Sequence, residues 1–301
     1  MFSKILTALE SLAFDAYWGK FSKLDIDKAS NEGAKFARFI GPKTSAHKTA
    51  ERNIRMCFPN FTDTQVQEIL DAMWDNLGRL AGELPHLGNL GYFKENSRVS
   101  MTGVEILDRY LEPNVGAVFA SGHFANWEVM PAAIVQRGVP CEVTYRAMNN
   151  KHIDQVIRDA RASYGVTLFA PKGKEGGMRL MRILAKGGSI AMMNDQKYDT
   201  GVSSPLLGHN CMTNDAAVRL AHRFKKPIQT MSLKRTGGAN FEVAIQEPIM
   251  LDFEKPIEEI VQSGVDTINK FLSDKITEAP DQYFWVHKRW PKDAWKNAGV
   301  I

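Results

Sequence analysis

Cysteine and long apolar runs are both scarce in this sequence. Only three cysteines occur in 301 residues, Cys57, Cys141 and Cys211, and no two of them have CxxC spacing. An odd number of cysteines without metal-binding spacing predicts free, packed thiols in a reducing compartment and no zinc site. No apolar run reaches the roughly 18 residues that a spanning helix needs. The sequence therefore predicts no transmembrane helix.

The sequence also lacks a strong excess of positive or negative charge. The formal net charge is only +4, with 24% charged and 44% hydrophobic residues. That balance is ordinary for a globular protein, so it excludes a disordered chain, and it is too small to argue for nucleic acid. It suits an anionic surface. There are no repeats and no low-complexity linkers, and the length allows one large domain or two modest ones.

The first residues lack the pattern of a signal peptide. Charged residues interrupt residues 1–21, and no apolar core or small-residue cleavage site is present. Apolar residues recur at helical spacing, at Ile5, Leu9, Leu12 and Ala16. This pattern fits a helix packed on the domain or one lying in a membrane interface. We expect residues 1–30 to form an amphipathic membrane-associating helix and residues 31–301 to form a single domain.

Strand-like and helix-like segments alternate through the middle of the chain. Buried-strand patterns such as "GAVFASG", "CEVTYR", "VTLFAP" and "GSIAMMND" alternate with helical ones. This order predicts an α/β fold, with a mixed central sheet flanked by helices and a helical N-terminal region. In such sheets, ligands bind where strands lead into helices. Residues 121–128, 146–150, 171–174 and 194–199 follow predicted strands and should gather at one edge.

The segment "AVFASGHFANWEVM" places His123 and Glu128 where a strand gives way to a helix. Gly122 allows a turn there, and a folded-back chain could bring the carboxylate to the imidazole. A carboxylate that accepts from one ring nitrogen fixes the tautomer, so the other nitrogen can take a proton from a hydroxyl. No G-x-S-x-G motif supplies a serine nucleophile. An isolated HxxxxE also occurs by chance, with a structural histidine as the alternative.

The other turns carry candidate anion-binding residues. Arg146 follows "CEVTY" and could grip a phosphate, or it is an exposed charge at a helix start. Lys172 and Lys174 lie in the glycine-containing "APKGKEGGMR", which suits an approaching anion or a solvated turn. Asp195 ends a strand in "MMNDQKYDTG", where it faces the site or caps a helix.

Aromatic and basic residues alternate in "DQYFWVHKRWP", near the end of the chain. This pattern is typical of a packed domain edge, and it also occurs in membrane-interface and nucleic-acid-binding segments. Methionines such as Met192 and Met193 fit core packing, or they line an acyl chain.

Five of these segments, in this order, resemble the bacterial lipid A biosynthesis acyltransferases, the lauroyl/myristoyl acyltransferase family. They are "SGHFANWE", "YRAMNN", "MMNDQKYDTG", "QYFWVHKRWP" and the upstream "ERNIRMCFPNFTDTQVQEILDAMWDNLGRLAGELPHL". The resemblance spans roughly residues 35–295. It implies a glycerol-phosphate-acyltransferase-like fold and a catalytic His123–Glu128 pair. It also implies substrate contacts from Asn126, Arg146, Asp195 and a lysine at position 172 or 174.

The resemblance further implies a reaction and its partners. An acyl chain passes from acyl carrier protein to the 3-hydroxyl of an acyl chain on a Kdo-lipid A precursor. The expected location is the cytoplasmic face of the bacterial inner membrane, with no metal, no organic cofactor and no nucleic acid. Two alternatives remain: an acyltransferase for lysophospholipids or glycolipids, which typically has HxxxxD, and a non-catalytic lipid-binding module.

Overall fold

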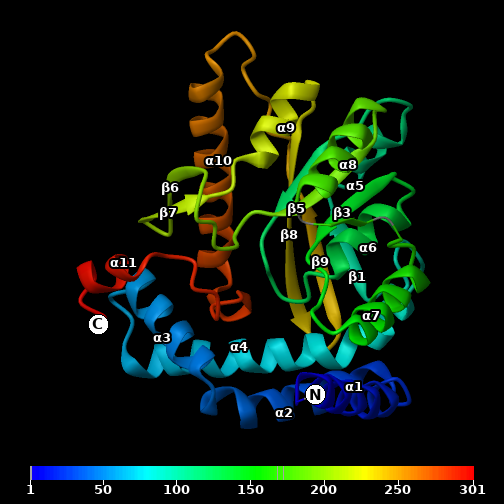
Figure 1. The fold of residues 1–301 in the computed structure, drawn as a ribbon, viewed down its shortest axis with the longest axis vertical. Helices are drawn as coiled ribbons and strands as arrows, with labels where there is room; N and C mark the ends of the chain where they lie inside the picture. The colour runs from blue at the N-terminus through cyan, green and yellow to red at the C-terminus, as the bar shows by residue number, and fades with distance from the viewer. Residues whose placement is uncertain (1, 168, 172) are drawn as a thin grey trace.

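The structure is a computed structural model that describes residues 2–167, 169–171 and 173–301. Within these ranges the chain forms an α/β domain preceded by helices (Figure 1). The α-helices are α1 (Phe2–Phe21), α2 (Ile26–Ile40), α3 (Ser45–Cys57), α4 (Asp63–Glu83), α5 (Val104–Asp108), α6 (Val129–Gln136), α7 (Lys151–Ser163), α8 (Lys174–Ala185), α9 (Ala216–Phe224), α10 (Ile257–Glu278) and α11 (Lys292–Asn297). The 3-10 helices are η1 (Gly41–Lys43), η2 (Leu84–Asn89), η3 (Arg109–Leu111) and η4 (Pro280–Gln282).

The strands build a central sheet and a separate hairpin. They are β1 (Val99–Thr102), β2 (Val118–Ser121), β3 (Cys141–Tyr145), β4 (Phe169–Pro171), β5 (Ser189–Met193), β6 (Val202–Leu206), β7 (His209–Thr213), β8 (Ile228–Gly237) and β9 (Asn240–Ile245). Within the described part of the chain, seven strands pair in the order β1-β9-β8-β2-β5-β3-β4, and β6 pairs with β7. The strands from β8 to β4 are parallel, while β9 and β1 run the opposite way.

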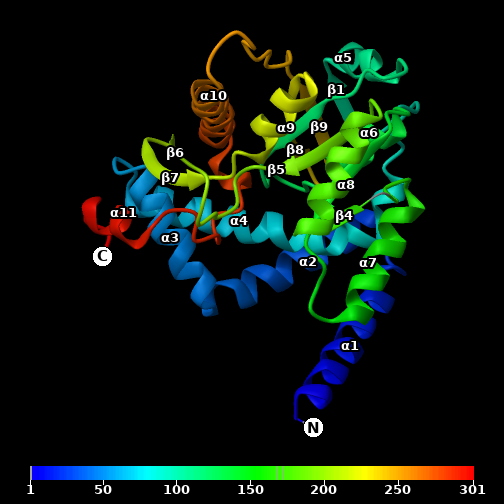
Figure 2. The same ribbon diagram turned by 45° about the horizontal axis from the view of Figure 1, so that its top comes forward.

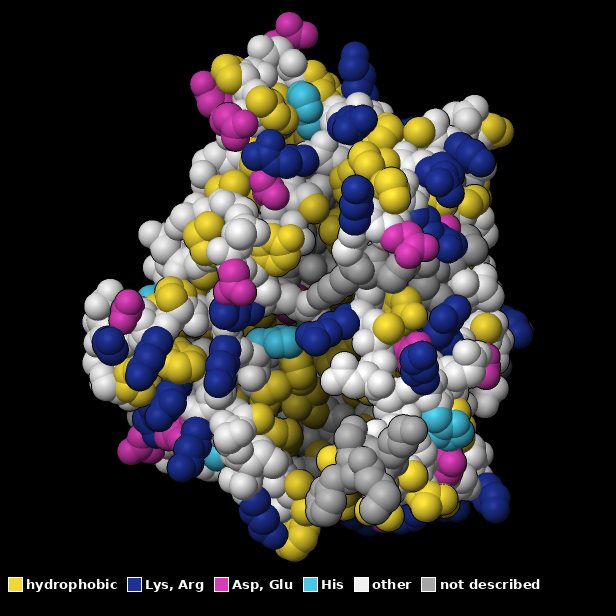
Figure 3. Space-filling view, in the orientation of Figure 1, with side chains coloured by type: hydrophobic (Ala, Val, Ile, Leu, Met, Phe, Trp, Pro, Cys, Tyr) yellow, Lys and Arg dark blue, Asp and Glu magenta, His cyan; other side chains and the backbone are white. Residues whose placement is uncertain are grey.

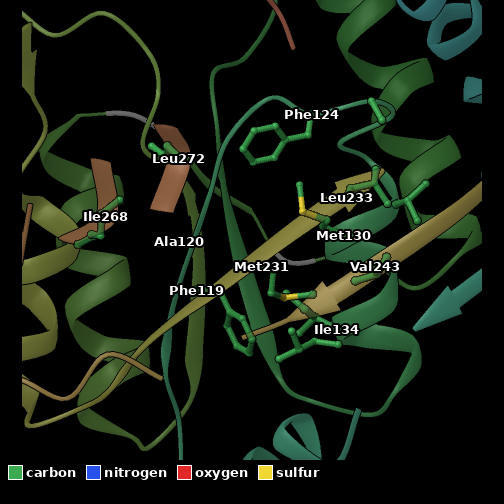
Figure 4. Close-up of a cluster of buried hydrophobic side chains, with 14 of the residues drawn as sticks. Phe119, Ala120, Phe124, Met130, Ile134, Met231, Leu233, Val243, Ile268 and Leu272 are labelled. Carbon is green, nitrogen blue, oxygen red and sulfur yellow. The ribbon is translucent and has the colours of Figure 1, made fainter. Parts of the chain in front are cut away.

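Apolar side chains cover both faces of the sheet. In Figure 4, Phe119, Met231 and Ile134 point toward one another on the side of α6, while Ile268 and Leu272 of α10 lie across the strands. All four residues of β2 are buried, as expected for a central parallel strand with helices on both faces. The predicted α/β class, with a mixed sheet flanked by helices, is confirmed.

The N-terminal helices lie across the edge where the parallel strands end (Figure 1). Helix α4 starts with a capping box in which Thr62 and Gln65 bond each other's backbone N–H. Helices α2 and α4 touch at Gly33 and Gly78, where a Cβ on Gly33 would lie 2.1 Å from the Gly78 carbonyl oxygen. Only glycine permits this approach. The predicted boundary at residue 30 falls inside α2.

Helix α1 leaves the body of the molecule toward its N-terminal end, as Figure 2 shows. It is fastened near its other end, where His86 of η2 contacts the Phe21 carbonyl at 2.8 Å. Its side chains at Leu6, Leu9 and Leu12 are exposed. Among the described helices, none has both the length and the apolar content needed to cross a membrane.

Candidate active site

His123 lies on the turn between β2 and α6, at the carboxyl edge of the sheet. Strand β2 is central, and it pairs with β5 on one side and β8 on the other. The role of Gly122 differs from our expectation, because its φ is not positive. A Cβ at this position would lie 2.9 Å from the Leu272 Cδ2 atom, so the end of the Leu272 side chain would have to move. The turn instead uses Ala125, whose φ of +43° is in the left-handed region.

Asp195 holds His123 at two points. Its Oδ1 lies 2.7 Å from the ring Nδ1, and its Oδ2 accepts the backbone N–H of His123 at 2.8 Å. A carboxylate only accepts, so Nδ1 carries the hydrogen and Nε2 keeps the lone pair. Asp195 is fully buried and His123 is 7% exposed. The pair is therefore fixed, with one nitrogen suited to accept a proton.

The charge of Asp195 is stabilised in spite of its burial. Burial alone raises the pKa of this carboxyl, but its electrostatic attraction to His123 and the two hydrogen bonds from that residue outweigh that effect. The pKa falls to about 2. Asp195 is consequently ionised at neutral pH, as a residue that orients an imidazole must be.

Glu128 does not take the place at the ring that we expected. Its two carboxylate oxygens accept from Arg161 of α7, at 2.8 Å from Nε and 2.5 Å from Nη2. Burial lowers the pKa of Arg161, but the charge of Glu128, its hydrogen bonds and the contribution of Tyr164 together outweigh burial and raise the pKa. Tyr164 also points its hydroxyl at Glu128, at 3.5 Å. Glu128 directly precedes α6, so this pair ties the start of α6 to α7.

Aromatic rings surround the imidazole. The ring centroids of Trp127, His287 and Phe284 lie 4.9, 5.4 and 5.8 Å from that of His123. The backbone N–H of Phe284 donates to the His123 carbonyl at 3.2 Å. The C-terminal "QYFWVHKRWP" therefore forms part of the site as well as part of the core, where Tyr283, Trp285 and Trp290 are buried. The alternation of aromatic and basic residues in this segment did not predict its contact with His123.

A buried polar network of α4 and β8 residues holds the turn between β2 and α6. Glu83 of α4 binds Arg235 of β8, with Oε1 at 2.5 Å from Nη1. Asn126 donates to the other oxygen of Glu83 at 2.8 Å. Asn76 donates to the Ala125 carbonyl at 3.2 Å and accepts from Arg235 at 2.9 Å. These residues are far apart in sequence, and no local pattern pointed to Glu83, Asn76 or Arg235.

The predicted substrate-contacting residues occupy different environments. Asn126 is fully buried, with its amide on Glu83, so it faces the interior. Arg146 is exposed in the turn after β3, and Lys174 is exposed at the first position of α8. Lys172 lies outside the described residues. The strand order places the turns after β2, β5, β3 and β4 along one edge, so His123, Asp195, Arg146 and Lys174 share it.

The face that carries this edge is hollowed (Figure 3). The hollow has hydrophobic side chains on its floor, with histidine and basic side chains at its rim. Between the sheet and α6 lies a mostly apolar cavity of about 40 Å³, lined by Phe119, Met130, Ile134, Met193, Met231 and neighbouring residues. No cluster of His, Cys, Asp and Glu in the described ranges is arranged to hold a metal ion. The site offers an imidazole, a carboxylate and apolar surface.

A fixed imidazole–carboxylate pair at the carboxyl edge of a parallel sheet is the arrangement of an α/β enzyme that moves a proton in its reaction. The sequence model described as "Bacterial lipid A biosynthesis acyltransferase" matches residues 6–292. The chain belongs to this family and is an acyltransferase.

Individual relatives are more distant. The lipid A biosynthesis palmitoleoyltransferase of Escherichia coli is 23% identical over 247 residues, which cover 80% of this chain and 77% of that protein. The lipid A biosynthesis myristoyltransferase of the same organism is 26% identical over 140 residues, covering 46% and 43%. A solved structure, the 1-acyl-sn-glycerophosphate acyltransferase PlsC of Thermotoga maritima, matches 88% of this chain and all of its own at 12% identity, with a TM-score of 0.39.

Proposed function

We propose that this protein transfers an acyl chain from acyl carrier protein to the 3-hydroxyl of an acyl chain on a Kdo-lipid A precursor. The observation that carries the proposal is the buried His123–Asp195 pair at the carboxyl edge of the parallel strands. The family assignment supports a lipid A acceptor. The names of two relatives, a palmitoleoyltransferase and a myristoyltransferase, support transfer of a fatty acyl group.

In the proposed mechanism His123 is the general base. Its Nε2 takes the proton of the acceptor hydroxyl, and the oxygen attacks the thioester carbonyl of the donor. The tetrahedral intermediate collapses with loss of the thiolate, to which His123 returns the proton. Backbone N–H groups at the start of α6 are the proposed oxyanion donors. No acyl-enzyme forms.

The ring contacts support this assignment of the two nitrogens. Asp195 binds Nδ1, and Nε2 has the side-chain amide nitrogen of Gln196 at 3.4 Å. That distance is long for a hydrogen bond, so an acceptor hydroxyl at a normal distance would replace it. Asp195 thus takes the orienting role that we first expected of Glu128. Glu128, held by Arg161, positions the start of α6.

Basic residues at the same edge are proposed to hold the anionic groups of the acceptor. Arg146 and Lys174 are exposed at the ends of β3 and β4, and Lys172 is a further candidate from the sequence. Arg can bind a phosphate through two parallel hydrogen bonds, whereas Lys acts as a point charge. Asn126 contributes indirectly, through the turn that carries His123.

The acyl chain of the donor is proposed to enter the apolar cavity beside α6, whose volume of about 40 Å³ must widen to hold the chain. Its lining includes Met130, Met193 and Met231, and flexible methionines adapt to a chain that fills the space. Ser121 and Met193 place the cavity next to the ends of β2 and β5, from which His123 and Asp195 follow. The carbonyl carbon would then lie near the imidazole.

Acyl carrier protein and a membrane surface are the proposed partners. The exposed Leu6, Leu9 and Leu12 of α1 are suited to the interface of a bilayer. Because the acceptor is itself a lipid, we place the protein at the cytoplasmic face of the bacterial inner membrane, with no cofactor.

The test is acyl transfer from acyl-carrier-protein donors of different length to a tetra-acylated Kdo-lipid A precursor. Wild type should add one acyl chain, and His123→Ala should lose about 10²- to 10⁴-fold in rate. If the protein acylates a lysophospholipid but not this acceptor, its substrate is another lipid. An active His123→Ala variant would remove the general base from the mechanism.

A further inference from the structure

Three large apolar side chains are exposed on the second half of α2. Phe36 is 67% exposed, Phe39 65% and Ile40 39%. Positions 36, 39 and 40 are spaced so that they share one face of the helix. We call these three residues the α2 surface. Such a group is uncommon on a soluble surface and indicates an interaction site.

The opposite face of α2 already has its partner. Ala29, Ser30, Gly33 and Ala34 are buried, and Gly33 meets Gly78 of α4 at backbone distance. Ser30 also donates to the buried Glu83 at 2.7 Å. The α2 surface therefore points away from the domain on a helix that is held rigidly, so its exposure does not come from loose packing.

Basic residues outnumber acidic ones in the segment that contains the α2 surface. Residues 26–57 contain seven Lys and Arg but only three Asp and Glu, an excess of +4 that equals the net charge of the whole chain. Lys43 lies over the ring of Phe39, at 3.4 Å from its centroid. Basic side chains next to exposed rings match an anionic, partly apolar partner.

We propose that the α2 surface is a second bilayer contact, which inserts Phe36, Phe39 and Ile40 into an anionic leaflet. Helix α1 supplies the first contact through leucines. Both helices lie beneath α4 in Figure 1, and in Figure 2 α1 extends below α7. Two separate contacts fix the tilt of the protein relative to the membrane, whereas a single contact through α1 would leave that tilt variable.

The chemistry of the α2 surface favours a bilayer over the acidic carrier protein. Two phenylalanines and an isoleucine on one helix face gain by insertion into an acyl region. An acidic protein would chiefly use the charges, yet two of the nearest are engaged: Lys35 pairs with Glu32 at 2.8 Å and Arg38 with Asp75 at 3.5 Å. Lys43, which lies over the Phe39 ring, assists attraction to anionic headgroups, while the rings supply the apolar contact.

The test is binding of the full-length protein to phosphatidylglycerol–phosphatidylcholine vesicles without any lipid A. Phe36→Ser/Phe39→Ser should lower the partition coefficient by about tenfold or more, from the apolar area removed. The matched control is Met250→Ser, because Met250 is 68% exposed and belongs to the segment between β9 and α10, which lies at the opposite end of the molecule from α2 in Figure 1. The control should bind as wild type does.

Two results would overturn the inference. Unchanged vesicle binding of the double variant would show that the α2 surface does not enter the bilayer. Unchanged vesicle binding with a raised KM for acyl carrier protein would assign the surface to the donor instead. The inference rests on the proposed function only for the membrane location of the acceptor. Vesicle binding needs no catalysis, so a failure of acyl transfer is seen separately.

Discussion

The carboxylate of Asp195 binds both the ring and the backbone of His123, at 2.7 and 2.8 Å. One side chain from the end of β5 thus fixes the position of the residue and the rotation of its imidazole. The tautomer follows from the same contact. A change at Asp195 should therefore act on catalysis more than on substrate binding.

Asp195→Asn should lower kcat by about 10²- to 10⁴-fold, because a neutral amide neither enforces the tautomer nor stabilises the protonated ring. KM for either substrate should change little. Steady-state kinetics with both substrates varied measures this. The control is Asp199→Asn in the same loop, whose side chain is 83% exposed. Full activity of Asp195→Asn would show that catalysis does not need the Asp195 carboxylate.

Acid should destabilise the protein partly through the same carboxyl. The folded pKa of Asp195 is about 2, below its ordinary value of 3.8. The unfolded state therefore binds the proton more readily, and the carboxyl's contribution of about 2 kcal/mol disappears as pH falls from about 4 to about 2. Denaturant unfolding across this range measures it. Asp195→Asn should show a shallower loss, and an equal slope would contradict the assignment.

Glu128 and Arg161 should behave as a structural pair. Their side chains are only 10% and 19% exposed, so Glu128→Gln should cost about 3–5 kcal/mol by leaving a buried cation without its partner. Glu128→Met/Arg161→Met removes both charges and should recover most of this stability and most of the activity. Thermal unfolding and kcat are the measurements. A stable double variant as inactive as His123→Ala would give Glu128 a direct chemical role.

Asn76 should influence catalysis from α4. It donates to the carbonyl of Ala125, the turn residue with a φ of +43°. Asn76→Asp keeps the acceptor for Arg235 but replaces that donor with a repelling oxygen. The turn should shift, with a loss in kcat of up to about 10²-fold and unchanged KM. Asn31→Asp, at an exposed hydrogen bond to Arg79, is the control; a matching loss there would point to a general effect.

The cavity beside α6 should set the preferred donor length. Ile134→Val removes one methylene from its lining, so the ratio of rates for longer over shorter donors should rise about fourfold. Competition between acyl-carrier-protein donors, read by mass spectrometry of the product, gives this ratio. Ile268→Val is the matched control, because Ile268 is equally buried but lies across the sheet on α10. An equal shift in the control would place the chain elsewhere.

Local patterns predicted the elements that are built from local signals. The buried run of β2 and the helix after it follow from nearby residues. The hairpin of β6 and β7 and the short β1 were missed. Pro205 lies within β6, and proline argues against a strand. The sequence therefore predicted the fold class but not the β6–β7 hairpin or strand β1.

The site was predicted in part for the same reason. His123 and Asp195 each stood out at the end of a strand, but HxxxxE drew attention to a neighbour in sequence. The contact to Nδ1 comes from 72 positions away, because β5 lies beside β2. The pairing of Glu83 with Arg235 spans 152 positions. Such contacts depend on the strand order and on the packing of α4, which no short motif encodes.

The aromatic side of the site, which includes Phe284 and His287, is synthesised after the helices α1 and α2. These residues come late in the chain, whereas α1 and α2 come first. A nascent chain on the ribosome thus exposes both proposed lipid contacts long before His123 has its final surroundings. Delivery to the bilayer can precede the onset of activity, and a chain released early would occupy the membrane without consuming the acyl donor.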